Sequence, residues 1–129
     1  PIGANLDRVQ VVKGWLDSKG KSHEKVFDVV WSDNRTPDPQ GKLPQVGDTV
    51  NHEYAHYENT IGSTELQTLW TDDSFKPEQR AFYYVRVLEI PTPRHSLYDS
   101  VALQIAPPKE GPATIQERAY TSPVWYTPK

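Results

Sequence analysis

Apolar residues recur at alternate positions in two neighbouring stretches near the start of the chain. Residues 6–17 (LDRVQVVKGWLD) and residues 24–31 (EKVFDVVW) both follow this pattern over much of their length. A period of two indicates β-strands, and the β-branched valines favour strand over helix. Gly20 lies in the polar stretch between them and suits a turn. The pattern therefore predicts a β-hairpin.

The strongest strand signal lies later in the chain. Residues 81–90 (AFYYVRVLEI) are largely apolar on both faces, which is typical of a central strand covered on both sides. Pro91 and Pro93 end this strand. Residues 118–126 (RAYTSPVWY) predict a last strand, and Pro123 within it indicates an edge strand or a bulge.

The remaining segments complete the expected fold. We predict a Pro-rich loop at 32–47, short strands at 50–58 and 64–71, and a long loop at 94–113. The sum is an all-β fold, an antiparallel β-sandwich of immunoglobulin-like type with roughly six to seven strands and long Pro-rich loops. A chain of 129 residues suits one module with a single core, spanning residues 1–129.

Composition narrows the function classes. The net charge is −3 and the basic residues are scattered, which argues against a nucleic-acid partner. Cysteine is absent, which excludes disulfides, Cys-ligated zinc and thiol catalysis. No apolar run is long enough for a membrane-spanning helix. The chain begins at Pro1 and contains no Met, so we expect it to be a fragment of a larger protein.

Residues 52–56 read HEYAH and match the zinc-protease motif H-E-x-x-H. In that motif two His ligands lie one helical turn apart and the Glu is the general base. His52, Glu53 and His56 would take these roles. The third ligand would come from another carboxylate, for which the candidates are Glu65, Glu78 and Glu89.

The surroundings of the motif argue against a zinc hydrolase. Gly47 and Gly62 flank it closely, and the residues between them include poor helix formers. On a strand, His52 and His56 would share a face while Glu53 faced the other side. We favour exposed histidines, with a surface metal site at His52 and His56 as the alternative. Two other polar sites, His23 and Asp72-Asp73, are expected to be solvated in turns.

The tryptophans raise the alternative of a carbohydrate-binding or other ligand-binding module. Sandwich modules often stack aromatic rings on sugar faces. Trp15, Trp31 and Trp70 accompany other apolar residues and are expected to pack in the core. Trp125 lies in the terminal edge segment and is the tryptophan that we expect to be partly exposed.

Four segments carry a resemblance to a known family. They are residues 3–17 (GANLDRVQVVKGWLD), 59–75 (NTIGSTELQTLWTDDSF), 80–94 (RAFYYVRVLEIPTPR) and 117–128 (ERAYTSPVWYTP). In this order they resemble the C-terminal end of the domain-of-unknown-function 3604 family, over nearly the whole chain. The HEYAH segment is not a defining feature of that family.

The resemblance implies a tail joined to a larger body. The body of such proteins resembles metal-dependent hydrolases of the polymerase and histidinol phosphatase superfamily, and it would hold the His and carboxylate ligands. The resemblance thus implies no catalytic residue, metal or cofactor in this part. We expect a structural or docking module whose partner is the preceding catalytic domain. Members of the family often look exported, to the periplasm or outside the cell.

Two places are candidates for contact with that domain. Arg94, Tyr98 and Asp99 form a polar-aromatic mix of the kind enriched at interfaces, and Trp125 with Tyr126 forms the second candidate. The alternative for the first is a local pair in which Arg94 and Asp99 fix the loop. A module separated from its neighbour exposes an apolar patch, so we also expect weak self-association.

Overall fold

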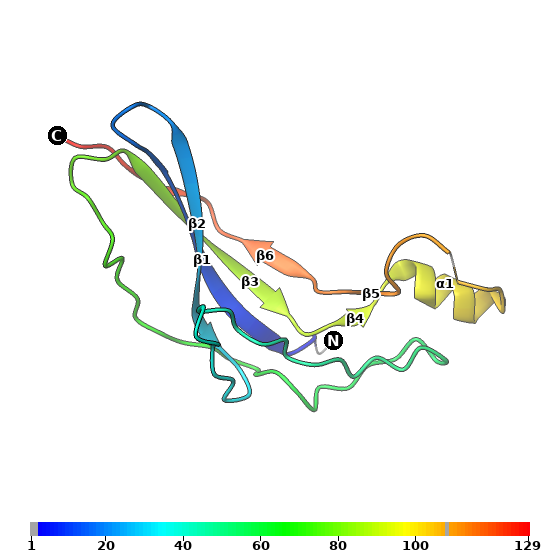
Figure 1. The fold of residues 1–129 in the computed structure, drawn as a ribbon. Helices are drawn as coiled ribbons and strands as arrows, with labels where there is room; N and C mark the ends of the chain where they lie inside the picture. Colours follow the sequence, from blue (N-terminus) through cyan, green and yellow to red (C-terminus); the bar gives the residue numbers. More distant parts are fainter. Residues whose placement is uncertain (1–2, 108) are drawn as a thin grey trace.

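The computed structural model describes residues 3–107 and 109–129, and its main element is one antiparallel sheet (Figure 1). The long strands are β1 (Leu6–Leu16), β2 (Ser22–Trp31) and β3 (Ala81–Glu89), and β1 lies between the other two. β1 and β2 pair antiparallel and form the predicted hairpin. The predicted strand over residues 81–90 is confirmed as β3.

The outer edge of β3 is completed by two short strands. β6 (Arg118–Tyr120) and β7 (Val124–Tyr126) both pair with β3, one after the other. Pro123 lies between them and cannot donate a backbone hydrogen bond, so it interrupts the edge. The prediction of an interrupted edge strand over 118–126 is therefore confirmed.

The predicted long loop at 94–113 is wrong in part, because it contains a helix. After β4 (Thr92–Pro93) comes α1 (His95–Leu103), and β5 (Thr114–Ile115) returns to pair with β4. The helix has no side-chain cap at its start and ends at a left-handed Gln104, where a Gly is usual. Both of the common sequence signals for a helix are thus missing. Within the described ranges, no helix has the length and apolar character needed to span a membrane.

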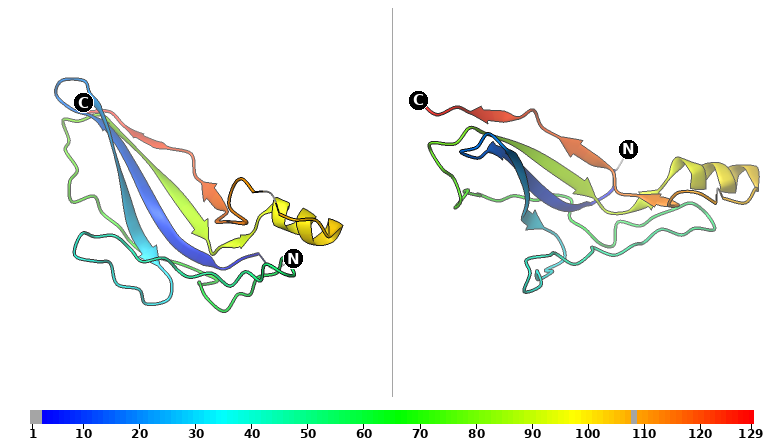
Figure 2. Two further views of the ribbon diagram at one scale, coloured as in Figure 1. Left: turned by 45° about the vertical axis from the view of Figure 1, so that its right-hand side comes forward. Right: turned by 45° about the horizontal axis from the view of Figure 1, so that its top comes forward.

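The fold is mostly β and antiparallel, as predicted, but the structure does not confirm the finer prediction of an immunoglobulin-like sandwich. The described residues form one sheet of five strands and one ladder of two strands, and no second sheet packs on the first. The strands predicted at 50–58 and 64–71 are wrong, because neither segment pairs with a strand of the sheet; the bridge between Asn51 and His56 closes within the first segment. They belong to an irregular segment, residues 32–80, that passes along one side of the sheet (Figure 2).

The two faces of the sheet are therefore unequal. We call the face next to residues 32–80 the covered face, and the other the open face. The alternation of the strands and their register assign each residue. The covered face includes Val11, Lys13, Phe27 and Tyr83, and the open face includes Gly14, Phe82, Tyr84, Tyr120 and Trp125. Among the described residues, no helix or strand lies over the open face.

Candidate functional site

The H-E-x-x-H segment forms a tight turn, not a helix. Asn51 and His56 exchange two backbone hydrogen bonds, of 2.7 and 3.2 Å, and close the turn. The Asn51 side chain accepts hydrogen bonds from the backbone N–H groups of Glu53 and Tyr54, and Ala55 has a positive φ of 49°. The helical spacing that the zinc motif requires is therefore not present.

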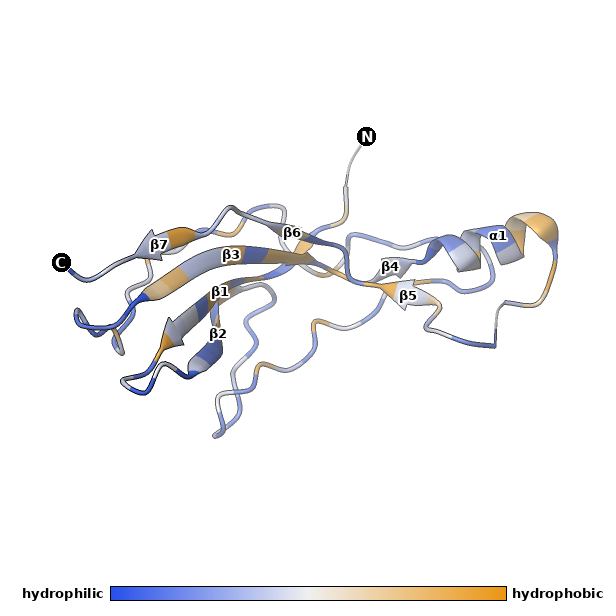
Figure 3. Cartoon of the chain, turned by 90° about the horizontal axis from the view of Figure 1, so that it is seen from above, coloured by the Kyte–Doolittle hydropathy of each residue, from blue (hydrophilic) through white to orange (hydrophobic). Residues whose placement is uncertain are grey.

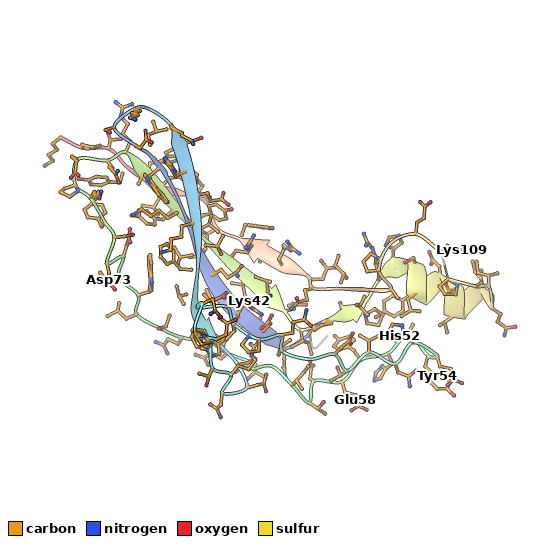
Figure 4. The ribbon with its side chains drawn as sticks, in the orientation of Figure 1. Lys42, His52, Tyr54, Glu58, Asp73 and Lys109 are labelled. Carbon is orange, nitrogen blue, oxygen red and sulfur yellow. The ribbon has the colours of Figure 1, made fainter. Side chains whose placement is uncertain are left out.

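The turn lies beside α1 and away from the sheet (Figure 4). The side chains of His52 and Glu53 line a shallow cavity together with Leu97 and Val101 of α1, whereas His56 stacks on Tyr57. Over residues 3–107 and 109–129, no three His, Asp or Glu side chains gather in a way that could hold a metal ion. The three carboxylates considered as a third ligand are thus not brought to the histidines; they are Glu65, Glu78 and Glu89.

The first predicted interface group belongs to the region of α1. Arg94 is the N-cap residue of the helix, and Tyr98 and Asp99 are exposed on it. Arg94 and Asp99 form no ion pair in the described part of the chain, so the alternative of a local pair is wrong. The far end of α1 is apolar and exposed through Leu103 and the following Ile105 (Figure 3).

The second predicted group divides between the two faces of the sheet. Trp125 lies on the open face and is 73% exposed, which confirms its predicted exposure. Tyr126 points to the covered face, where its ring packs edge-on against Phe75 and its hydroxyl donates to the Pro77 carbonyl. Tyr126 thus has a structural role in holding the segment 32–80.

Aromatic rings form a continuous row on the open face. The centroids of Trp125 and Phe82 are 5.1 Å apart, those of Phe82 and Tyr84 6.4 Å, and those of Tyr84 and Tyr120 6.1 Å. The Phe82 ring lies over Gly14 on the neighbouring strand, where a Cβ would be 2.3 Å from the ring. Gly14 therefore allows the row to lie close to the sheet.

The row continues into a groove at the hairpin end of the open face. The groove has a volume of about 600 Å³. Phe82 and Trp125 line it from the row, and Leu16 lines it from β1. Glu24 and Arg80 add one charge of each sign to its wall. An apolar groove with a few polar groups is the usual form of a small-ligand or partner site.

Below the aromatic row, the open face carries a polar network that links three strands. Gln10 of β1 donates to Asp28 of β2 at 2.7 Å and accepts from Arg86 of β3 at 2.8 Å. Arg8 also donates to Asp28, at 3.4 Å. These contacts hold the long polar side chains against the sheet, and they leave the aromatic row as the apolar part of the face.

A buried ion pair on the covered face was missed by sequence reasoning. Lys13 Nζ donates to Asp72, and the exposed fractions of the two side chains are only 4% and 7%. Tyr83 donates its hydroxyl to the same carboxylate at 2.7 Å. The prediction that Asp72 is solvated is therefore wrong. The signal was Lys13 itself, a cation in an apolar row that needs a buried partner.

These contacts change the ionisation of both groups. Burial opposes the charge on Asp72, but the hydrogen bonds from Lys13, Ser74 and Tyr83 outweigh it and hold its pKa well below the usual range. Burial, together with the neighbouring Asp72 carboxylate, raises the pKa of Tyr83 above its usual range. Asp72 is therefore ionised and Tyr83 neutral at physiological pH. This is the pattern of a structural ion pair.

His23 is also placed differently from the expectation. It lies in β2, where its ring stacks on Trp15 with centroids 5.4 Å apart and interacts with the Asp17 carboxylate at 2.9 Å. The hydrogen bond with His23 is the main cause that lowers the pKa of Asp17. The predicted turn position of His23 is wrong, because the hairpin register places it in β2 beside Trp15. Its side chain remains 36% exposed, so it is still partly solvated. The three tryptophans expected in the core are half-buried; they are Trp15, Trp31 and Trp70.

Comparison with known families gives one clear result. The family described as "Protein of unknown function (DUF3604)" matches residues 1–128. This chain belongs to that family. Searches of curated proteins and of solved structures found no significant match. The family therefore agrees with the resemblance seen in the sequence, and its description assigns no activity.

Proposed function

We propose that this chain is a non-catalytic docking module that packs, through the open face of its sheet, against a preceding domain of the same protein. The observation that carries the proposal is the aromatic row. Trp125 and Tyr120 at its ends are 73% and 55% exposed, although large aromatic side chains are mostly buried in folded proteins. Exposed rows of this kind mark interaction sites.

The chemistry of the open face favours a protein partner. Tryptophan, tyrosine and arginine are enriched at interface centres, and all three occur on this face as Trp125, Tyr120 and Arg86. The polar network around Asp28 is already satisfied within the sheet. Arg86 donates only to the neutral Gln10 and has no carboxylate partner among the described residues, so a partner domain that covers it should bring an acceptor for its charge. The proposed partner is a metal-dependent hydrolase domain, on the basis of the family resemblance.

The direct test uses the preceding domain produced separately and titrated with the 129-residue chain. Trp125→Ala should weaken binding about tenfold or more, because buried aromatic anchors dominate interface energies. Val124→Ala is the matched control, since Val124 lies on the same strand, is 70% exposed and points to the covered face. Equal effects of the two substitutions, or no binding by the unchanged chain, would refute the docking role.

A second function, carbohydrate binding, is favoured by the groove at the hairpin end. Trp125 offers an exposed ring beside Phe82, and Glu24 and Arg80 stand at the wall to hydrogen-bond sugar hydroxyls. The two rings are tilted by 46°, so a sugar would stack on one ring and contact the edge of the other. Titration of tryptophan fluorescence with neutral sugars at millimolar concentration tests this, and an unchanged spectrum would exclude it.

A further inference from the structure

A second cavity lies at the opposite end of the sheet from the hairpin groove. Its volume is about 600 Å³, within the usual range for small-molecule sites. One wall is the irregular segment from Gln45 to Asp48, and the other is the chain from Thr114 to Arg118. Asp7 and Arg8 line it from the end of β1. Its lining is more polar than that of the hairpin groove, and neither the family description nor the docking role assigns it a ligand.

Arginine dominates the charge of this cavity. Arg8, Arg94 and Arg118 all contribute to its lining, against the carboxylates Asp7 and Asp48. Among the described residues, the side chains of Arg94 and Arg118 form no ion pair and donate no hydrogen bond. The guanidinium groups of these two arginines therefore keep all of their donors for a ligand.

The one buried carboxylate of the cavity is already neutralised. Asp7 is 0% exposed, and its two oxygens accept from Arg35 at 2.6 Å, Gln116 at 2.8 Å and Arg8 at 3.1 Å. Arg35 donates from behind the cavity and is not part of its lining. Arg35 and Arg8 thus match the negative charge of Asp7. Arg94 and Arg118 then face the one remaining lining carboxylate, Asp48, so the cavity keeps a net positive charge.

Arg94 has an unfavourable position that an anion would relieve. It is the N-cap residue of α1, where the helix dipole disfavours cations, and the first turn contains no acidic residue. No side chain caps the first N–H groups of the helix. An anion beside Arg94 would offset both the side-chain charge and the positive end of the dipole.

We propose that this cavity binds a small organic molecule that carries two or more negative charges. Two arginines with open donors suit carboxylate or phosphate oxygens, which guanidinium groups bind in bidentate fashion. The volume exceeds that of a bare phosphate ion, so the charged groups are attached to an organic body. The site lies apart from Trp125 and does not depend on the docking role.

The test is calorimetric titration of the 129-residue chain with citrate, with inorganic phosphate and with the uncharged ester triethyl citrate. Citrate should bind with a dissociation constant below about 1 mM, phosphate should bind more weakly, and the uncharged ester should not bind. Arg94→Gln and Arg118→Gln should each weaken citrate binding about tenfold, and Arg118→Lys should weaken it less. Circular dichroism of each variant verifies that the fold is kept.

Arg80→Gln is the matched control, because Arg80 is exposed and lines the other groove. It changes the net charge by the same amount and should leave citrate binding unchanged. Three results would overturn the proposal. They are no citrate binding at about 10 mM, an equal loss of affinity in Arg80→Gln, and unchanged affinity in both Arg94→Gln and Arg118→Gln.

Discussion

On the covered face, side chains of β1, β2 and β3 pack against residues 32–80. On the open face, among the described residues, they pack only within the sheet, against one another and against the edge strands β6 and β7. The covered face accordingly holds a buried ion pair, Lys13 with Asp72, and rings such as Trp70 that reach it from the covering segment. The open face keeps its rings in a row that ends at the exposed Trp125. The difference supports the proposal that the covered face stabilises the fold and the open face binds a partner.

The largest expected effect comes from breaking the buried pair of the covered face. Asp72→Ala leaves Lys13 as a buried cation without its carboxylate, and it removes the acceptor of the Tyr83 hydroxyl. We expect a loss of about 2–4 kcal/mol in the free energy of unfolding. Denaturation in urea measures it.

The neighbouring Asp73 provides the control for this prediction. It is exposed on the same turn (Figure 4), so Asp73→Ala should change the stability by less than about 0.5 kcal/mol. If the two substitutions cost the same, the ion pair does not anchor residues 32–80 to the sheet.

The same pair predicts how stability depends on pH. The pKa of Asp72 is lower in the folded chain than in the unfolded chain, where it is about 3.9. The unfolded chain therefore takes up the proton first, and the contribution of Asp72 is complete above about pH 4 and is lost as the pH falls toward its folded pKa.

Asp72→Asn should remove this part of the acid dependence, whereas Asp73→Asn should keep it. Urea denaturation at a series of pH values between about 5 and 2 checks the difference. Glu89 acts in the opposite sense, because burial and the neighbouring Glu117 raise its pKa. The contribution of Glu89 to stability is therefore lost as the pH rises through its pKa in the folded chain. A variant Asp72→Asn with the same acid slope as the unchanged chain would contradict the account.

On the open face, we expect the largest loss of stability from a substitution at the contact between Gly14 and Phe82. Gly14→Ala places a Cβ where the Phe82 ring now lies, and it should cost about 1–3 kcal/mol. In a Phe82→Leu background, the same substitution should cost clearly less, because the smaller side chain can yield. A double-mutant cycle by chemical denaturation gives the coupling. Additive costs would mean that the ring does not rest on Gly14.

The smallest effect is expected from the exposed end of the row. Trp125→Ala should change the stability of the 129-residue chain by less than about 1 kcal/mol, because the ring is mostly in solvent. The unchanged chain should self-associate weakly through this face at high concentration, and Trp125→Ala should abolish the association. Urea denaturation measures the change in stability, and analytical ultracentrifugation measures the self-association of the two chains. A strictly monomeric unchanged chain would contradict the expectation.

The parts of the fold that the sequence predicted are those with a local pattern. The period-two alternation in β1, β2 and β3 and the break at Pro123 depend only on neighbouring residues. The segment 32–80 could not be predicted in the same way. Side-chain contacts hold this segment, and it pairs with no neighbouring strand. Its sequence therefore shows no regular spacing of apolar residues from which its course could be predicted.

The contacts of the site illustrate the same limit. Asp72 and Lys13 are 59 residues apart, and only the fold shows that they meet. The lysine in the apolar row of β1 indicated that a partner existed but did not identify it. The exposure of Trp125 could be predicted because Pro123 already marked its strand as an edge. The aromatic row could be found only from the pairing register, which brings Trp125 of β7 beside Phe82 and Tyr120 of β6 close to Tyr84.

The most direct test of the docking role is hydroxyl-radical footprinting of Trp125 and Tyr120. The 129-residue chain is compared with a longer chain that carries the preceding domain. Leu69, 96% exposed on the covering segment, serves as the internal reference. The account predicts that Trp125 and Tyr120 are labelled several-fold more slowly in the longer chain, with Leu69 unchanged. Equal labelling of Trp125 in both chains would contradict the central claim that the open face is covered by that domain.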